Sequence, residues 1–89
     1  MPKSSPAELS ALRDEVFTRD GGCIWLGCDT GDRLEMAHIR HRGMGGSREA
    51  NRADNCVTLC STHHAVFDGR LGSASRYELG RLLLKLAGV

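Results

Sequence analysis

Residues 57–64 read VTLCSTHH, a stretch that places two of the chain's four histidines side by side just after a cysteine. Adjacent residues on a helix point about 100° apart, so neighbouring side chains do not easily serve one site. The doublet His63-His64 therefore predicts two sites, one on each side of a short helix. The remaining ligands of both sites must come from elsewhere in the chain.

The chain has 89 residues, which is the size of a single domain spanning 1–89. Only 40% of the residues are hydrophobic, so the core is small and needs further stabilisation, which the four cysteines can provide as disulfides or as a metal site. The first ten residues contain no apolar run typical of a secretory signal, and no segment has the roughly 20 apolar residues of a membrane span. We therefore expect a cytoplasmic protein, where reduced thiols favour metal binding over disulfides.

The net charge is only +1, but basic residues gather in one segment. Residues 38–52 contain four arginines and two histidines against one acidic side chain, Glu49. A local cluster of this kind can bind phosphate groups although the whole chain is nearly neutral. A solvated surface loop can have the same composition. The candidate phosphate-contacting side chains are Arg40, His41, Arg42, Arg48 and Arg52.

Both ends of the chain carry signals for the start of a helix. Residues 5–8 form a capping box with proline at the first helical position, which predicts a helix that ends before the Gly21-Gly22 pair. Residues 75–78 form a second capping box, which predicts a last helix closed by Gly88. The apolar stripe of this helix, which we expect to lie in the core, consists of Leu79, Leu82, Leu83 and Leu86.

The central part of the chain has the pattern of a strand, a loop, a strand and a helix. Residues 34–39 and 56–59 are predicted strands, and the helix runs from Ser61 to about Asp68. Residues 40–54, which include three glycines, form a long loop of the kind that is usually functional or mobile. Together with the terminal helices, this order predicts an α+β domain.

A structural metal site can be assembled from the cysteines and His63 in two ways. One set uses all four cysteines, and the other replaces Cys56 with the histidine. If residues 56–59 are extended, Cys56 and Cys60 lie about 13 Å apart at roughly 3.3 Å per residue, too far for one ion. Cys60-x2-His63 instead turns from strand into helix with a normal ligand spacing. We therefore predict a closed zinc site on Cys23, Cys28, Cys60 and His63, the alternative being four reduced thiols packed in a core.

His64 then points away from the zinc and is available for chemistry. Asp68 lies four residues further on, on the same helical face, and the two side chains can hold one divalent ion or form a plain surface hydrogen bond. His38 ends the first strand and is the candidate general base, because a neutral imidazole with a pKa near about 6.5 accepts a proton from water. Asn55 opens the second strand, where its amide can tie the long loop to that strand.

These residues together resemble the HNH endonuclease family, part of the His-Me finger (ββα-metal) nucleases. The matching segments are RDGGCIWLGC, EMAHIRHRGMGGS and DNCVTLCSTHHAVFDG, within residues 19–69. Family members place a histidine on the first strand before paired glycines, an asparagine ahead of a Leu-Cys pair, and a histidine on the helix. His38, Asn55 and His64 occupy these positions. The resemblance implies a small zinc-stabilised ββα-metal core with flanking N- and C-terminal helices.

The resemblance also implies a metal-dependent DNA endonuclease or nickase of a bacterial cell, encoded by the bacterium or by a phage. His38 would activate water, and His64 with Asp68 would hold one divalent ion such as Mg²⁺, Mn²⁺ or another transition ion. Asn55 would fix the loop, and the five phosphate-contacting side chains named above would contact DNA. The expected products carry 5′-phosphate and 3′-hydroxyl ends. Two other functions stay open: a non-catalytic zinc-containing DNA-binding module, and a module that works beside phage packaging proteins.

Two positions depart from the family pattern. One is Asp68, where family members frequently carry histidine, and the other is Ala37. Many members carry Asp or His directly before the general base as a metal ligand, whereas this chain has Ala37. The ion would then have two protein ligands plus waters and phosphate, which Mg²⁺ accepts. Glu35, on the same strand face as Ala37, and His41 in the following loop are candidate replacements for the missing ligand.

Overall fold

A two-stranded antiparallel sheet forms the centre of the computed structural model, which describes residues 5–40, 50–69 and 73–89. Its register pairs His38 with Cys56 and Leu34 with Cys60. The candidate general base therefore lies at one end of the sheet and the candidate zinc ligand of the second strand at the other. In chain order, the elements are α1 (Pro6–Asp20), β1 (Leu34–His38), η2 (Ala53–Asn55), β2 (Cys56–Cys60), α2 (Ser61–Gly69) and α3 (Ser73–Leu86). This arrangement confirms the predicted α+β class.

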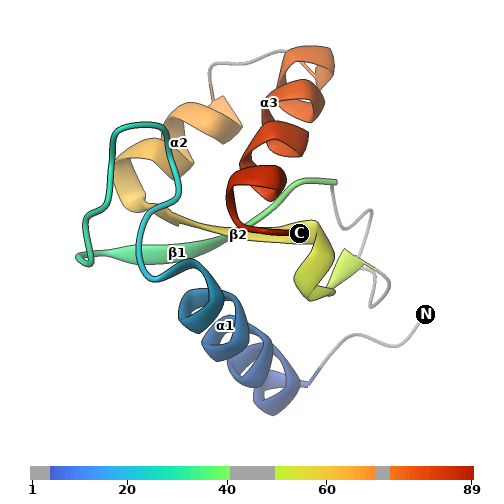
Figure 1. The fold of residues 1–89 in the computed structure, drawn as a ribbon. Helices are drawn as coiled ribbons and strands as arrows, with labels where there is room; N and C mark the ends of the chain where they lie inside the picture. Colours follow the sequence, from blue (N-terminus) through green and yellow to red (C-terminus); the bar gives the residue numbers. More distant parts are fainter. Residues whose placement is uncertain (1–4, 41–49, 70–72) are drawn as a thin grey trace.

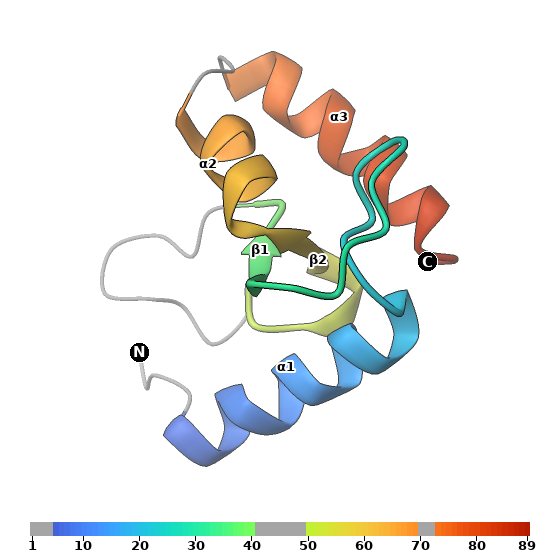
Figure 2. The same ribbon diagram turned by 90° about the vertical axis from the view of Figure 1, so that its left-hand side faces the viewer.

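The sheet lies between helices, with α1 on one side and α2 and α3 on the other (Figures 1 and 2). Because helices cover both faces, all five residues of β2 are buried. Val57 and Leu59 of this strand belong to the same core cluster as Phe67 of α2 and Leu83 of α3. On the other face, Thr58 of β2 and Val16 of α1 are both fully buried, so helices bury both sides of the strand. Within the described residues, no helix combines the length and apolar character of a membrane span.

The first helix begins and ends as the sequence predicts. The Ser5 hydroxyl accepts a hydrogen bond from the Glu8 backbone N–H at 3.1 Å, and the Glu8 carboxylate accepts one from the Ser5 N–H at 3.0 Å. At the other end, Gly21 adopts a φ of 74° and its N–H donates to the Phe17 carbonyl at 2.9 Å. A left-handed residue at this position favours glycine. The predicted capping box and helix end are confirmed.

The last turn of α1 is attached to the start of β2. Arg19 donates to the backbone carbonyls of Ala53 and Cys56, both at 2.6 Å. The neighbouring Asp20 carboxylate accepts a hydrogen bond from the Thr58 backbone N–H at 2.8 Å. These contacts fix the segment in which Asn55 lies, immediately before the second strand.

The last helix differs from the prediction in its start and in its buried face. It begins at Ser73, so Ser75 lies inside it and the predicted capping box is wrong. Leu83 is fully buried and Leu79 packs against the core, but Leu82 and Leu86 are 42% and 46% exposed.

The physical reason is that an arginine and a glycine occupy the buried face of α3. Arg76, Gly80 and Leu83 are all buried and lie at helical spacing. A Cβ atom at position 80 would lie 2.5 Å from Cγ2 of Ile39, so only glycine allows this close approach to the residue after β1. Neither Arg76 nor Gly80 belongs to an apolar pattern, so the leucine stripe predicted the burial of Leu79 and Leu83 but was wrong for Leu82 and Leu86.

Candidate functional site

Four potential metal ligands gather where the segment after α1 meets the corner between β2 and α2. Their ligand atoms all lie within 4.8 Å of one another, and the residues are Cys23, Cys28, Cys60 and His63. The sulfur of Cys60 is 3.2 Å and that of Cys23 is 3.6 Å from Nδ1 of His63. Tetrahedral zinc with ordinary bond lengths separates a sulfur from a nitrogen ligand by about 3.6 Å. The donor set and its spacing therefore fit a metal such as zinc.

Backbone hydrogen bonds shape the loop that carries the first two cysteines. The Cys23 N–H donates to the Thr30 carbonyl at 3.0 Å, and the Cys28 N–H to the Trp25 carbonyl at 2.8 Å. The Ile24 N–H donates to the Thr58 carbonyl at 2.9 Å, which attaches the loop to β2. The loop thereby brings both sulfurs to the end of β2, where the strand turns into α2.

The surroundings of the cluster shift the pKa values of two of its thiols in opposite directions. Burial raises the pKa of the Cys23 thiol to about 11. The pKa of Cys60 is lowered, chiefly because the backbone N–H of His63 donates a hydrogen bond to its sulfur. The His63 ring is stacked on Trp25, with centroids 4.8 Å apart and planes within 3°. The cluster thus contains one thiol with a raised pKa, one thiol with a lowered pKa and an imidazole stacked on an aromatic ring.

Cys56 takes no part in this cluster. It is fully buried at the other end of β2, opposite His38. The extended strand between Cys56 and Cys60 separates the two thiols, as the sequence predicts.

His64 contacts a different group of side chains. Its Nδ1 is 2.7 Å from Oε1 of Glu35, and its Nε2 is 3.0 Å from Oδ2 of Asp68. The two carboxylates therefore meet opposite edges of one imidazole ring. Glu35, a candidate replacement for the ligand missing at Ala37, thus contacts Nδ1 of His64 and not the Nε2 edge that Asp68 contacts. The other candidate replacement, His41, lies outside the described residues.

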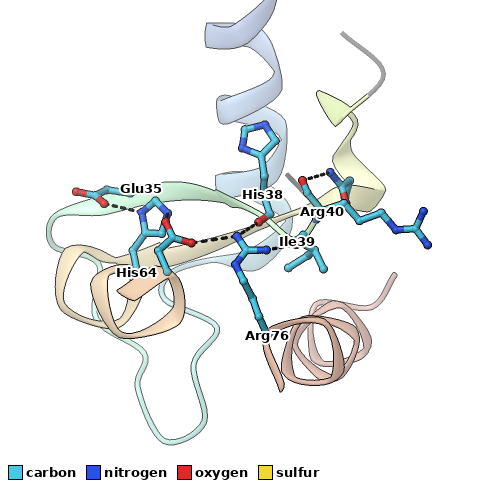
Figure 3. A network of polar contacts seen from close by, with 8 residues as sticks. Glu35, His38, Ile39, Arg40, His64 and Arg76 are labelled. Atoms are coloured by element: carbon cyan, nitrogen blue, oxygen red, sulfur yellow. Dashed lines mark hydrogen bonds and ion pairs between the residues drawn. The ribbon is translucent and has the colours of Figure 1, made fainter. Parts of the chain in front are cut away.

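His64 and Asp68 share a cavity with the predicted general base. The cavity has a volume of about 810 Å³ and is lined by residues of α1, β1, α2 and α3, among them His38, Glu35, His64, Asp68 and Arg76. In Figure 3 the His38 ring points toward α1, while Glu35 and His64 meet beside β1 and α2. The structure thus brings the imidazole of β1 and the imidazole–carboxylate pair of α2 to one concave surface.

The His38 ring is held by a residue that the sequence analysis missed. Its Nε2 lies 2.7 Å from Oδ1 of Asn51, at the end of the long loop. Asn51 lies four residues before Asn55, in a segment read only as loop, and no local pattern pointed to it.

Asn55 ties the two ends of the loop together. Its side-chain oxygen accepts a hydrogen bond from the Arg40 N–H at 3.1 Å, and its side-chain nitrogen donates to the Ala50 carbonyl at 2.9 Å. Its backbone carbonyl accepts from the Ile39 N–H at 2.8 Å. The amide therefore joins the residues after β1 to those before β2.

Two of the five predicted DNA-contacting residues can be placed. Arg40 is exposed at the end of β1, and Arg52 is 66% exposed and forms an ion pair with Asp54 at 2.7 Å. The other three, His41, Arg42 and Arg48, lie outside the described residues.

Comparison with known proteins identifies the family. Neither the curated proteins nor the solved structures gave a match. A family model described as HNH endonuclease matches residues 23–72, more than half of the 89 residues. This match spans the cysteine–histidine cluster, both strands and α2. The chain therefore belongs to the HNH endonuclease family.

Proposed function

We propose that this protein is a metal-dependent DNA endonuclease or nickase that acts at the cavity lined by His38, His64 and Asp68. The observation that carries the proposal is the convergence of these side chains on one cavity in a chain of a nuclease family. His38 comes from β1 and the other two from consecutive turns of α2.

The pair on α2 offers two ligands for a divalent ion, Nε2 of His64 and Oδ2 of Asp68. When bound, such an ion would stabilise negative charge on the phosphate and on the leaving oxygen. Glu35 acts as a positioning residue in this scheme. Its carboxylate holds Nδ1 of His64, and a carboxylate on the second ring nitrogen fixes the orientation of a metal-binding histidine.

His38 accepts the proton of the attacking water in the proposed reaction. An imidazole can do so near neutral pH because its ordinary pKa is about 6.5. Asn51 holds the His38 ring, and Asn55 holds the backbone just after it. Both amides thus keep the base at a fixed place on the cavity that the ion-binding pair also lines.

Basic side chains around this cavity would contact the DNA backbone. Arg13 of α1 contributes to the cavity lining, and Arg40 is exposed where β1 ends. Phosphate contacts carry no sequence information, so we expect weak sequence preference and strong dependence on salt.

The cysteine–histidine cluster has a structural role in this proposal. It is closed, with four protein ligands and none left for substrate, which is typical of structural zinc. It would hold the start of α2 and thereby the position of His64, the next residue after its own histidine.

The direct test is nicking of supercoiled plasmid in the presence of Mg²⁺, Mn²⁺ or Ni²⁺. The wild-type protein should convert the plasmid to the open circle, and His38→Ala should lose about 100-fold or more of the rate. Asp14→Asn, a change of an exposed carboxylate on α1, serves as the matched control and should keep full activity. Equal rates for wild type and His38→Ala would remove His38 as the base.

A non-catalytic DNA-binding module is the second candidate, and one observation favours it. Among the described residues, the cysteine–histidine cluster is the one group that brings three or more potential metal ligands together. The second site therefore offers an ion two protein ligands, His64 and Asp68. Retarded mobility of DNA without cleavage in any of the three ions would support this module and contradict the nuclease.

A further inference from the structure

We propose that Arg76 of α3 is a positioning residue of the nuclease site, an inference that rests on the proposed function. Arg76 lies beyond residues 23–72, which the family model matches. It belongs to a helix that the sequence indicated only as a flanking element. The structure makes this helix a neighbour of both halves of the candidate site.

Three hydrogen bonds carry the inference (Figure 3). Nη2 of Arg76 donates to the backbone carbonyl of His38 at 2.6 Å and to Oδ1 of Asp68 at 3.0 Å. Nη1 donates to the backbone carbonyl of Ile39. One guanidinium group therefore joins the end of the strand that bears the base to the carboxylate of the ion-binding pair.

The surroundings of Arg76 show that this arrangement is built into the fold. The residue is 5% exposed, and its guanidinium carbon lies 4.4 Å from the centroid of the Phe67 ring. Arginine is almost never buried unless it is paired. Here Asp68 supplies the negative charge, and the carbonyls of His38 and Ile39 supply further acceptors.

The contact with Asp68 has a consequence for ion binding. Arg76 takes Oδ1 of the carboxylate, while Oδ2 faces Nε2 of His64. The carboxylate is thereby held in one orientation before an ion arrives. The planar fork of arginine can bond several acceptors at fixed angles, which the single ammonium group of lysine cannot reproduce. Arg76→Lys should therefore keep the charge but release the carboxylate.

The test measures the nicking rate against Mn²⁺ concentration for the wild type, for Arg76→Lys and for the control Arg81→Lys. Arg81 is exposed on the same helix and lies outside the lining of the cavity. Removal of a group that orients a metal ligand typically weakens metal binding about 10–100-fold. We expect Arg76→Lys to raise the half-saturating Mn²⁺ concentration by that factor, with unchanged zinc content, and Arg81→Lys to match the wild type.

A cycle with Asp68→Asn separates positioning from a general loss of structure. If Arg76 acts through the carboxylate, Arg76→Lys adds little further loss of Mn²⁺ affinity in the Asp68→Asn background. If the losses of Mn²⁺ affinity caused by Arg76→Lys and Asp68→Asn add fully, the inference is contradicted. It is also contradicted if a zinc-loaded Arg76→Lys protein has the Mn²⁺ dependence of the wild type.

A measurement on the unmodified protein keeps the inference testable if Arg76→Lys does not fold. The side-chain ¹H–¹⁵N signals of Arg76 should shift when Mg²⁺ is added to the wild type, because one of its acceptors becomes an ion ligand. Unchanged signals at saturating Mg²⁺ would overturn the proposal. Wild-type protein that neither nicks DNA nor binds Mg²⁺ or Mn²⁺ would instead reject the proposed function itself.

Discussion

His63 and His64 are neighbours in the chain, yet their rings meet different partners. Nδ1 of His63 lies 3.2 Å from the Cys60 sulfur, whereas Nδ1 of His64 lies 2.7 Å from the Glu35 carboxylate. The rotation between consecutive helical residues directs one ring to the cysteine cluster and the other to the cavity beside β1. Substitutions at the two positions should therefore have different effects.

We predict that His63→Ala impairs folding and that His64→Ala impairs only nicking. Loss of one zinc ligand removes metal-binding free energy, which in a chain this small is largely folding free energy. His64→Ala leaves all four cluster ligands in place. Metal analysis and circular dichroism should show a zinc-depleted, unfolded His63→Ala protein and a zinc-loaded, folded His64→Ala protein. Equal stability of the two variants would contradict the assignment.

Removal of zinc from the wild type should be visible in the fluorescence of Trp25. This is the single tryptophan of the chain, and it is stacked on the ring of His63. A chelator that takes the zinc should separate the two rings and expose the indole, with a red-shifted emission maximum and loss of helical signal in the same transition. An unchanged emission spectrum after complete zinc removal would show that the metal does not hold this part of the fold.

Local spacing accounts for the parts of the structure that the sequence predicted. The capping box at Ser5 and the cysteine spacings are short-range signals whose geometry the backbone largely determines. Contacts between distant segments were not predictable in this way. The partner of His64 depends on how α2 packs on β1, which brings Glu35 to the ring, and the burial of Arg76 depends on carbonyl acceptors 37 and 38 residues away.

Glu35→Gln should weaken binding of the proposed catalytic ion without affecting zinc. The charged carboxylate holds Nδ1 of His64, and loss of such a partner typically costs about 10–100-fold in metal affinity. Titration of zinc-loaded protein with Mn²⁺, followed by calorimetry, measures this directly. Glu15→Gln, a change of an exposed residue on α1, is the matched control. If Glu35→Gln binds Mn²⁺ as the wild type does, Glu35 does not position His64.

Asn55→Ala should destabilise the protein by about 1–2 kcal/mol, because each hydrogen bond of its partly exposed amide contributes about 0.5–1.5 kcal/mol. The Arg40 N–H and the Ala50 carbonyl would both lose the amide that joins them. Because these residues flank the two ends of the loop, nicking should fall by more than the loss of folded protein explains. Urea unfolding measures the loss of stability, and the plasmid assay measures the loss of nicking. If nicking falls only in proportion to the folded fraction, Asn55 has a structural role alone.

Loading the metal-free protein with zinc should release protons near neutral pH. The Cys23 thiol is protonated at pH 7 both in a folded metal-free site, where burial raises its pKa to about 11, and in an unfolded chain, where its ordinary pKa is 9.0. It must therefore lose its proton to bind the metal. Zinc affinity should therefore increase as the pH rises from 6 to 8. Calorimetry in buffers of different ionisation enthalpy counts the protons, and Cys23→Ser should release fewer. Zinc uptake with no proton release would contradict a Cys23 thiol that is protonated before it binds zinc.

The separation of two metal sites by adjacent histidines is tested most directly by anomalous X-ray diffraction. Crystals of zinc-loaded protein soaked in Mn²⁺ should show zinc among Cys23, Cys28, Cys60 and His63, and a separate manganese peak beside His64 and Asp68. A single cation bound by both imidazoles, or a cavity that takes up no manganese beside His64, would contradict the account.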